Sequence, residues 1–223
     1  MGTQNSRYIP VLSFRWLTWI YDPLLKWGMR EETFKRALIE QANTKAGMKV
    51  LDLGCGTGTL TVMLKQMRPD ARITGLDGDK EVLEIARSKA EHSGVDLQLN
   101  LGMAYSLPYS DGTFDIVVSS LVIHHLTSAD KRSAFQEVLR VLSPGSSFHI
   151  VDFGPPYNRL TKVQAFFMQN LEEAADNFKG NILAMLQESG FEAEITKVMN
   201  TIFGPIAFYH AVKPNRKNIN NAN

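Results

Sequence analysis

The stretch Val50-Leu-Asp-Leu-Gly-Cys-Gly-Thr-Gly58 decides the fold, because a short apolar strand runs directly into a turn rich in glycine. The next residues, at about 58–67, have the spacing of an amphipathic helix. Glycines at 54, 56 and 58 permit positive φ angles and let a ligand approach the backbone with no Cβ in the way. A strand, a glycine turn and a helix N-terminus in this order predict a nucleotide-type pocket.

An acidic residue, Asp77, ends the next predicted strand, 23 residues beyond Gly54. A carboxylate in this position can accept hydrogen bonds from both hydroxyls of a ribose. The dinucleotide fingerprint G-x-G-x-x-G would need a glycine where the chain has Thr59, so an NAD-dependent oxidoreductase fits poorly. The spacing is instead G-x-G-x-G, preceded by Asp52, an acid that would repel phosphates but could help to hold an ammonium group.

From about residue 48 onward, apolar β-branched runs alternate with helical periodicity, which predicts a parallel sheet between helices. The link Phe203-Gly-Pro205 is too short to carry a helix, so the two strands that it joins are predicted to be antiparallel. The predicted strands are 48–53, 71–77, 96–101, 114–119, 146–152, 192–199 and 206–213, and the predicted helices are 58–67, 79–92, 129–142 and 177–189.

This pattern resembles the class I S-adenosylmethionine (SAM) methyltransferases, whose first motif is an acidic residue followed by G-x-G-x-G. Three later segments are similar, in order and spacing, to motifs of the UbiE-like branch, also called methyltransferase type 11: Leu107-Pro-Tyr-Ser-Asp-Gly-Thr-Phe-Asp-Ile-Val-Val-Ser119, His124-His-Leu126 and Val141-Leu-Ser-Pro-Gly145. The resemblance covers most of the chain. It implies a Rossmann-like, doubly wound α/β sheet of seven strands, mostly parallel with a reversed last strand and with helices on both faces. It also implies SAM as cofactor and S-adenosylhomocysteine as its product.

The resemblance places several residues around the cofactor. Gly54 and Gly56 are expected beside the methionine part of SAM, with their amides directed at its carboxylate. Asp77 is expected to bind the ribose, although it could instead cap the following helix, a role that Asp79 can also fill. Asp52 would orient the loop and face the amino group. The complete predicted set is Asp52, Gly54, Cys55, Gly56, Asp77, Gly78, Met103, Ala104 and Ser119.

The end of the third strand departs from the family pattern. Gly102-Met103-Ala104 stands where the family usually has Gly-Asp-Ala, and Met103 cannot supply the strong acceptor that holds the adenine amino group. Adenine would then be held by stacking, by apolar contact with Met103 and Leu76, and by backbone groups near Ala104. Ser119, ending the fourth strand, would line the cofactor near the sulfonium.

The sequence does not single out a catalytic residue. The sulfonium already makes the methyl group electrophilic, so the protein must mainly align the acceptor and exclude water. A general base is needed only if the attacking atom must lose a proton. The candidates for that base are His124 or its neighbour His125, Asp152 at the end of the fifth strand, and Tyr21. A histidine in this position could equally cap the next helix or pair with a backbone carbonyl.

Two segments lie outside this core, which we place at 46–213. Residues 1–45 read as amphipathic helices rich in aromatic side chains, and apolar residues recur at helical spacing over about 156–176. Because an insertion after the fifth strand emerges where such sheets bind ligands, we predict that the two segments form a lid over an apolar substrate pocket. A plain helical cap or a dimer contact is the alternative. The polar, Asn-rich residues 214–223 are predicted to be a disordered tail.

Composition agrees with a catalytic domain of this kind. With 223 residues, 44% of them hydrophobic, the chain can bury a core without disulfides. The single cysteine, Cys55, cannot form an internal bridge and reads as a small filler, and it favours a reducing compartment. The net charge of +1 gives no case for binding nucleic acid, and the histidines show no metal-ligand spacing. No apolar run reaches roughly 18 residues and no signal peptide is apparent, so the cytoplasm is the expected location.

These observations predict a SAM-dependent methyltransferase that acts on a small, apolar acceptor. The Arg- and Lys-flanked tryptophans near the N-terminus could also rest on a membrane surface. Two alternatives stay open. A SAM-binding enzyme could run a different reaction, since the fold does not fix the chemistry. A partner subunit without activity could have kept the fold, and Met103 is the hint for that.

Overall fold

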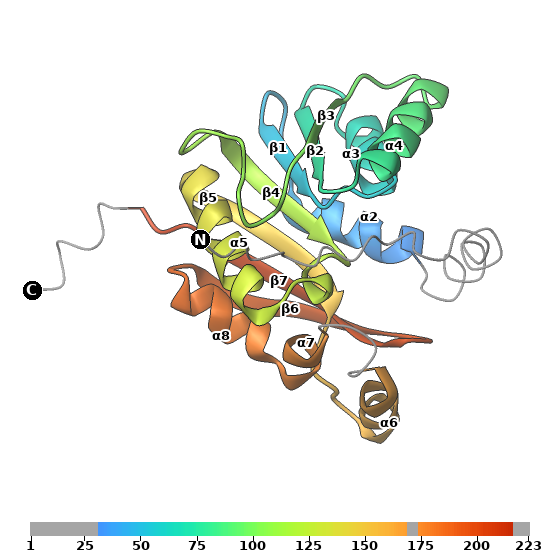
Figure 1. The fold of residues 1–223 in the computed structure, drawn as a ribbon, viewed down its shortest axis with the longest axis vertical. Coiled ribbons are helices and arrows are strands. Elements are labelled where there is room, and N and C mark those ends of the chain that lie inside the picture. The colour runs from blue at the N-terminus through green and yellow to red at the C-terminus, as the bar shows by residue number, and fades with distance from the viewer. Residues whose placement is uncertain (1–30, 169–173, 216–223) are drawn as a thin grey trace, which may run out of the picture.

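The computed structural model describes residues 31–168 and 174–215, which fold around a seven-stranded sheet in the order β3-β2-β1-β4-β5-β7-β6 (Figure 1). β7 runs antiparallel to both of its neighbours, and the other pairs are parallel. The predicted doubly wound sheet with a reversed strand is therefore confirmed. The strands are β1 (Lys49–Leu53), β2 (Arg72–Asp77), β3 (Gln98–Leu101), β4 (Phe114–Ser120), β5 (Leu142–Phe153), β6 (Glu192–Thr201) and β7 (Gly204–Val212).

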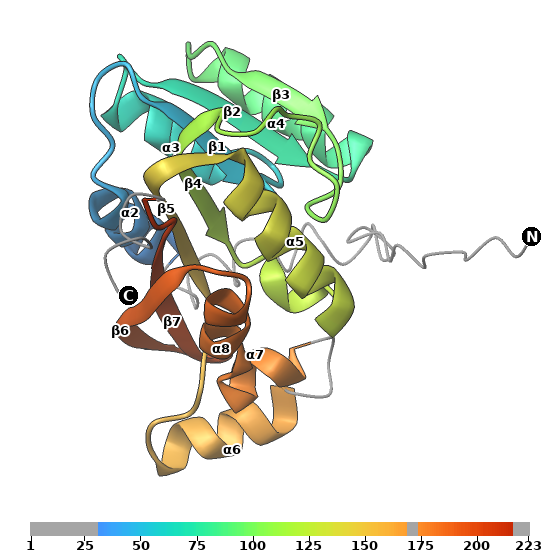
Figure 2. The ribbon, with the colours of Figure 1, turned by 90° about the vertical axis from the view of Figure 1, so that its left-hand side faces the viewer.

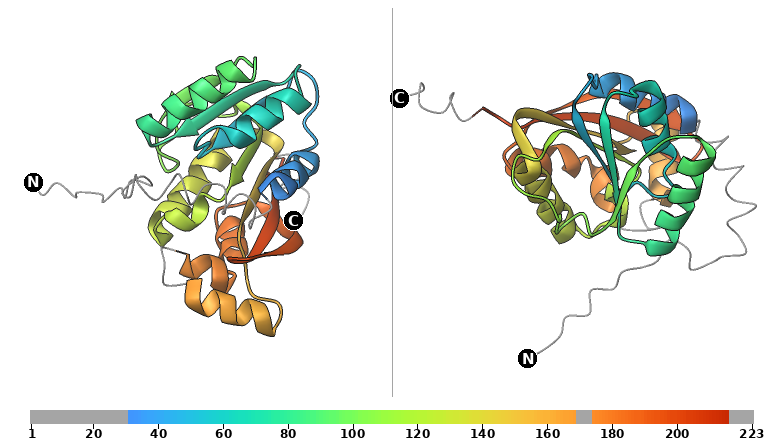
Figure 3. Two further views of the ribbon diagram at one scale, coloured as in Figure 1. Left: turned by 90° about the vertical axis from the view of Figure 1, so that its right-hand side faces the viewer. Right: turned by 90° about the horizontal axis from the view of Figure 1, so that it is seen from above.

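Helices cover both faces of the sheet, as Figure 2 and the right-hand view of Figure 3 show. Alternate residues of the central strands point to opposite faces, so each face builds its own apolar core. α2 and α3 cover one face, and α5 and α8 cover the other. The described helices are α2 (Glu31–Ala42), α3 (Thr59–Met67), α4 (Lys80–His92), the short 3₁₀ helix η1 (Ile123–His125), α5 (Ser128–Val141), α6 (Arg159–Met168), α7 (Ala175–Lys179) and α8 (Asn181–Glu188).

α2 changes the predicted boundary of the core. It lies within the segment 1–45 that we assigned to a lid, yet Phe34, Leu38 and Ile39 are fully buried against the sheet and α3. The core therefore starts by residue 31 and not at residue 46. The remainder of that segment, 1–30, lies outside the described residues, and so does most of the predicted tail.

Two predicted elements differ from the structure. The helix expected at 177–189 is divided into α7 and α8 by Gly180, whose φ of +78° is left-handed and ends a helix. β5 starts at Leu142 and not at residue 146, because the ladder with β4 continues through a register shift between Phe114 and Ile116. The ends of the other core strands and helices lie within two residues of their predicted positions.

Candidate active site

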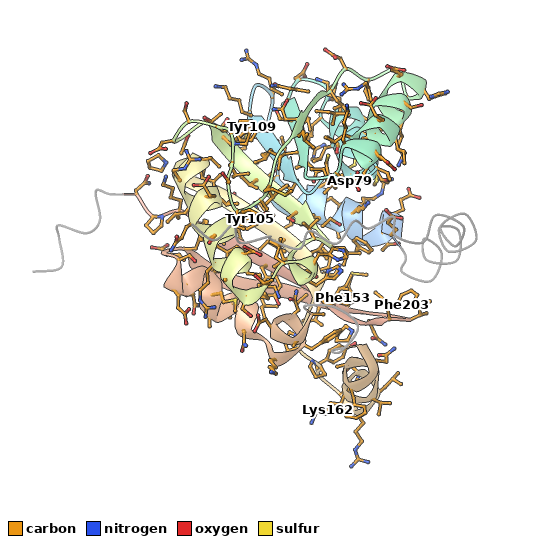
Figure 4. All side chains as sticks on the ribbon, viewed as in Figure 1. Asp79, Tyr105, Tyr109, Phe153, Lys162 and Phe203 are labelled. Atoms are coloured by element: carbon orange, nitrogen blue, oxygen red, sulfur yellow. The ribbon has the colours of Figure 1, made fainter. Side chains whose placement is uncertain are left out.

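The carboxyl ends of β1 and β4 form the point where the sheet changes direction. From β1 the chain winds outward through β2 to β3, and from β4 it winds the opposite way to β5. Loops that leave two such strands diverge to opposite faces, and doubly wound sheets bind their ligands at this point. Asp79, just beyond β2, and Phe153, at the end of β5, mark this edge in Figure 4. The predicted cofactor residues come together here.

The glycine loop is folded tightly against β2. The amides of Gly54 and Cys55 both donate to the carbonyl oxygen of Leu76, at 2.8 and 3.0 Å. A Cβ on Gly54 would lie 2.5 Å from the side chain of Val122, whereas a Cβ on Gly56 would meet no atom within 4 Å. The open side of the loop is thus at Gly56. The amide of Gly54 is used within the protein, so our expectation that it points to the methionine carboxylate was wrong.

Asp77 sits beside this open position. Its Oδ2 accepts a hydrogen bond from the amide of Gly56 at 2.8 Å, and its Oδ1 accepts one from the amide of Asp79 at 3.0 Å. The Gly56 amide, too, is therefore directed at a side chain and not at the cofactor carboxylate. Asp79 caps α4 by accepting from the amides of Glu81 and Val82. Since helix capping belongs to Asp79, the remaining lone pairs of Asp77 can accept from ribose hydroxyls.

Asp52 carries a carboxylate oxygen without a partner. The residue is buried, and its Oδ2 accepts a hydrogen bond from the hydroxyl of Thr61 at 2.6 Å, while Oδ1 has none. Burial raises the pKa of Asp52 to about 6. A buried acceptor without a donor is costly, so this oxygen is suited to a ligand that brings one. The ammonium group of a SAM methionine is such a donor.

The two serines at the end of β4 face opposite sides of the sheet. Ser119 is fully buried, and its hydroxyl donates to the carbonyl oxygen of Leu53 at 3.0 Å, so it ties β4 to β1, and its place near the cofactor stays a prediction. Ser120 faces the other side of the sheet, the side of Asp52, and its buried hydroxyl has no partner. The prediction missed Ser120. The signal available was the strict alternation of strand residues, which puts consecutive serines on opposite faces.

The turn after β3 lies against the end of β2, where Asp77 is. The amide of Gly102 donates to the carbonyl oxygen of Asp77 at 2.9 Å, and a Cβ on Gly102 would lie 3.0 Å from Leu76. Met103 and Ala104 are therefore held next to Asp77, where an adenine bound beyond the ribose would reach them. Gly78, directly after Asp77, is half-buried in the same turn.

Cys55 is part of the packing beneath the loop. Its side chain is buried against Gly75, where an added Cβ would lie 2.9 Å from the sulfur. Burial raises the pKa of its thiol well above the usual range, so the group stays protonated and unreactive. Its predicted role as a filler agrees with this environment.

Two of the candidate bases form a pair. His124 Nδ1 lies 2.8 Å from Asp152 Oδ1, and both side chains are buried. Asp152 Oδ2 accepts from the amides of Val122 and Ile123 at 3.1 and 2.8 Å, so the carboxylate also caps η1. Burial alone would raise the pKa of Asp152, but the charge and the hydrogen bond of His124, together with the hydrogen bond from the amide of Phe153, hold it below its usual value. The carboxylate thus stays ionised and orients the imidazole.

Aromatic rings surround this pair. The imidazole of His124 lies edge-on to the ring of Phe153 at 4.8 Å between centroids, and Phe153 contacts Phe178 of α7 at 5.3 Å. His125 is exposed and its ring lies 4.1 Å from that of His124. Asn177 of α7, which packs against η1, is fully buried, and neither of its amide atoms has a partner. Tyr21, the third candidate, lies outside the described residues.

Two negative findings apply to the described part of the chain only. Residues 31–168 and 174–215 contain no group of three His, Cys, Asp or Glu side chains that could hold a metal ion. Within the same ranges, every helix is too short or too polar to cross a bilayer.

A glycine loop, an acidic residue at the end of β2 and a doubly wound sheet with a reversed strand define the fold of a class I SAM-dependent methyltransferase. The profile of a methyltransferase domain family matches residues 44–206, about three quarters of the chain, so the protein belongs to that family. SAM is its cofactor, and the NAD alternative is excluded. The orphaned oxygen of Asp52, the open backbone at Gly56 and the position of Asp77 fit SAM.

Similar proteins carry names from quinone biosynthesis. A demethylmenaquinone methyltransferase of Thermus thermophilus is 37% identical over 61% of this chain and 61% of its own length. The UbiE protein of Shewanella sediminis, named as a ubiquinone/menaquinone biosynthesis C-methyltransferase, is 34% identical over 61% of this chain and 55% of its own. The chain therefore spans about three fifths of the relatives that it matches.

Solved structures agree on the fold. The YcgJ protein of Bacillus subtilis superimposes with a TM-score of 0.66 at 20% identity, covering 81% of this chain and 98% of that one. A Haemonchus contortus phosphoethanolamine N-methyltransferase, solved with S-adenosylhomocysteine, has a TM-score of 0.66 at 18% identity, covering 82% of this chain and 53% of its own. These identities establish a shared architecture alone.

Proposed function

We propose that this protein transfers the methyl group of SAM to a small, apolar acceptor that carries an ionisable ring hydroxyl, such as a hydroquinone. The observation that carries the proposal is the His124–Asp152 pair, which holds an oriented imidazole beside the apolar ring of Phe153, near the carboxyl ends of β4 and β5. The named activity of the Thermus relative supports the acceptor class, since a demethylated menaquinone is an apolar ring.

The cofactor-binding residues of this chain have separate tasks. Asp77 would accept from the ribose hydroxyls, Asp52 Oδ1 from the ammonium group, and Met103 would lie against the adenine. Ser120 has a spare hydroxyl on the same face as Asp52. Bound there, SAM supplies an electrophilic methyl group on a sulfonium. The remaining task of the protein is to align the acceptor within about 3 Å of that methyl and to exclude water.

His124 can act as the general base. Its Nδ1 is engaged by Asp152, so Nε2, on the far side of the ring, is the atom that would take a proton from the acceptor. Removing the hydroxyl proton raises the electron density of the ring, whose carbon can then attack the methyl group. The ring carbon afterwards loses its own hydrogen as a proton, and the ring oxygen takes up a proton, which restores the hydroxyl. The products are the methylated ring, S-adenosylhomocysteine and one proton in all.

The test is methyl transfer from labelled SAM to a demethylated, short-chain menaquinol, with mass analysis of the product. We expect His124→Asn and Asp152→Asn each to lower kcat/KM by about 10² to 10³, with the Kd for SAM almost unchanged. His92→Asn, a change on an exposed face of α4, is the control and should match the wild type.

Each alternative predicts a different result. Consumption of SAM without a methylated acceptor would indicate another SAM chemistry. Absence of SAM binding by the intact protein would favour a partner subunit. Full activity of His124→Asn would remove the base from the mechanism while leaving the transfer itself in place.

A further inference from the structure

α6 exposes large apolar side chains on its outer surface. Leu160, Val163 and Phe166 recur every three residues along the helix and are 61%, 56% and 65% exposed. Tyr157, just before the helix, is 54% exposed. Apolar side chains scattered singly over a surface need no explanation, but four on one helix and its approach form a contiguous feature.

The position of α6 makes this surface prominent. The helix lies at one end of the molecule, beyond the sheet, in both views (Figures 1 and 2). It is held there from below, because Thr161 and Ala165 are buried and Gln164 donates to the carbonyl oxygen of Thr201 at 3.1 Å. Thr201 opens the turn between β6 and β7, which adds a further exposed side chain, Ile202, beside the helix. The surface is thus rigidly supported.

The charge on α6 has one sign. Arg159 and Lys162 are exposed next to the apolar residues, and the sequence of the helix contains no acidic residue. α4 provides the contrast, since its exposed Ile85 stands among Glu84, Arg87 and other charges of both signs. Apolar side chains flanked by cations are the pattern that lies in the interface of an anionic lipid bilayer.

We propose that α6 and the β6–β7 turn dock this protein on an anionic lipid surface. Tyr157, Leu160 and Val163 would enter the headgroup region, while Arg159 and Lys162 contact lipid phosphates. The purpose of docking rests on the proposed function: α6 follows the carboxyl end of β5, so the active-site edge would be held near a surface in which an apolar acceptor dissolves.

The test is co-sedimentation of the full chain with phosphatidylcholine vesicles that contain or lack phosphatidylglycerol, without SAM or acceptor. Because the side chains are exposed, Leu160→Glu combined with Val163→Glu should keep the wild-type melting temperature but lower vesicle binding tenfold or more. Arg159→Glu with Lys162→Glu should do the same for the anionic vesicles alone. Ile85→Glu, an equally large exposed apolar residue on α4, is the matched control and should bind as the wild type does.

A second measurement reports on burial directly. Because Cys55 is buried, a cysteine at Val163→Cys can be labelled selectively with a polarity-sensitive fluorophore, with Ile85→Cys as the control. We expect a blue shift at 163 when anionic vesicles are added, and no shift at 85. A blue shift already present without vesicles would mean that another part of the chain, or a second copy, covers α6, and would overturn the proposal.

Docking and catalysis can fail separately. If the protein binds vesicles but does not methylate the menaquinol, the docking proposal holds and only the purpose proposed for docking is removed. If the wild-type protein methylates a detergent-dispersed acceptor but does not bind anionic vesicles, the docking proposal alone is overturned.

Discussion

At the scale of single residues, Asp52 couples folding to pH. Burial raises its pKa from 3.8 to about 6, so the folded protein holds a proton that the unfolded chain has already released between these values. Stability therefore decreases as pH rises from about 4 to about 6, and a penalty of roughly 3 kcal/mol persists above that range.

Asp52→Asn should remove this penalty. We expect the variant to be more stable than the wild type at pH 7 and to lose the advantage progressively towards pH 4. Urea unfolding at four pH values between these limits measures the difference. If the free energy of unfolding changes equally with pH in the two proteins, Asp52 is already ionised at low pH in the folded state.

The same carboxylate should link SAM binding to protons. An ammonium group at Oδ1 favours the ionised form, so binding releases a proton from Asp52 below pH 6, and the affinity for SAM should fall as pH decreases. Calorimetric titration in two buffers of different ionisation enthalpy measures the released proton. With Asp52→Asn the proton release should disappear, and its persistence would assign it to another group.

Asp77 and Asp79 offer a matched pair, because both are acids in one turn and only one should contact the cofactor. Asp77→Asn should weaken SAM binding about 10- to 100-fold, since hydrogen bonds to a charged acceptor are worth about 1.5–3 kcal/mol. Asp79→Asn should leave the affinity unchanged, since Asn also caps a helix well. Titration of both variants with SAM and with S-adenosylhomocysteine decides whether Asp77 has the ribose role.

Sequence reasoning worked for the helix cap, whose role is local. Asp79 directly precedes α4 and caps it, as predicted, whereas the ribose role of Asp77 stays a prediction. Contacts between distant segments were not visible: His124 and Asp152 are 28 residues apart, and only the pairing of β4 with β5 brings them together. Ser119 and Ser120 are adjacent in the sequence but face opposite sides of the sheet, so the choice between them decides on which face a predicted contact lies.

At the scale of elements, replacing glycine by alanine should have different consequences at two positions of the glycine loop. Gly54→Ala combines a φ of +70° with a 2.5 Å contact to Val122, so the loop must distort and the melting temperature should fall sharply. Gly56→Ala has a φ of +55° but open space, so we expect a loss of about 1 kcal/mol in stability. Its new methyl group would project into the cofactor site. Thermal melting with and without SAM separates the two, and SAM should stabilise Gly56→Ala little.

Element ends were predictable where a residue type fixes them. Asp79 begins α4 by capping its first amides, and β1, β2 and β4 are apolar runs bounded by polar turns. Gly180 misled the prediction, because its left-handed conformation becomes necessary only when α8 turns to pack on β6. The Ser143-Pro-Gly145 segment reads as a turn, yet the Gly145 amide donates to Lys213 and keeps the chain within the sheet.

At the scale of the whole molecule, the core and the predicted lid can be separated. α2 is the first described helix and belongs to the core, so a variant that lacks residues 1–30 should keep its melting temperature and its affinity for SAM. If those residues cover the acceptor, its kcat/KM should fall by tenfold or more, because water is no longer excluded. Turnover equal to that of the full chain would contradict the lid.

The last described strand, β7, fills the gap between β5 and β6, so the order of the sheet is not the order of synthesis. While the chain emerges from the ribosome, the glycine loop and β1 to β5 are complete long before the residues after 204 exist. Throughout that interval the edge of β5 offers unpaired backbone groups to any neighbouring nascent chain. Premature termination before Gly204 would thus release a protein with an intact cofactor loop and an open sheet edge, and we expect that protein to aggregate.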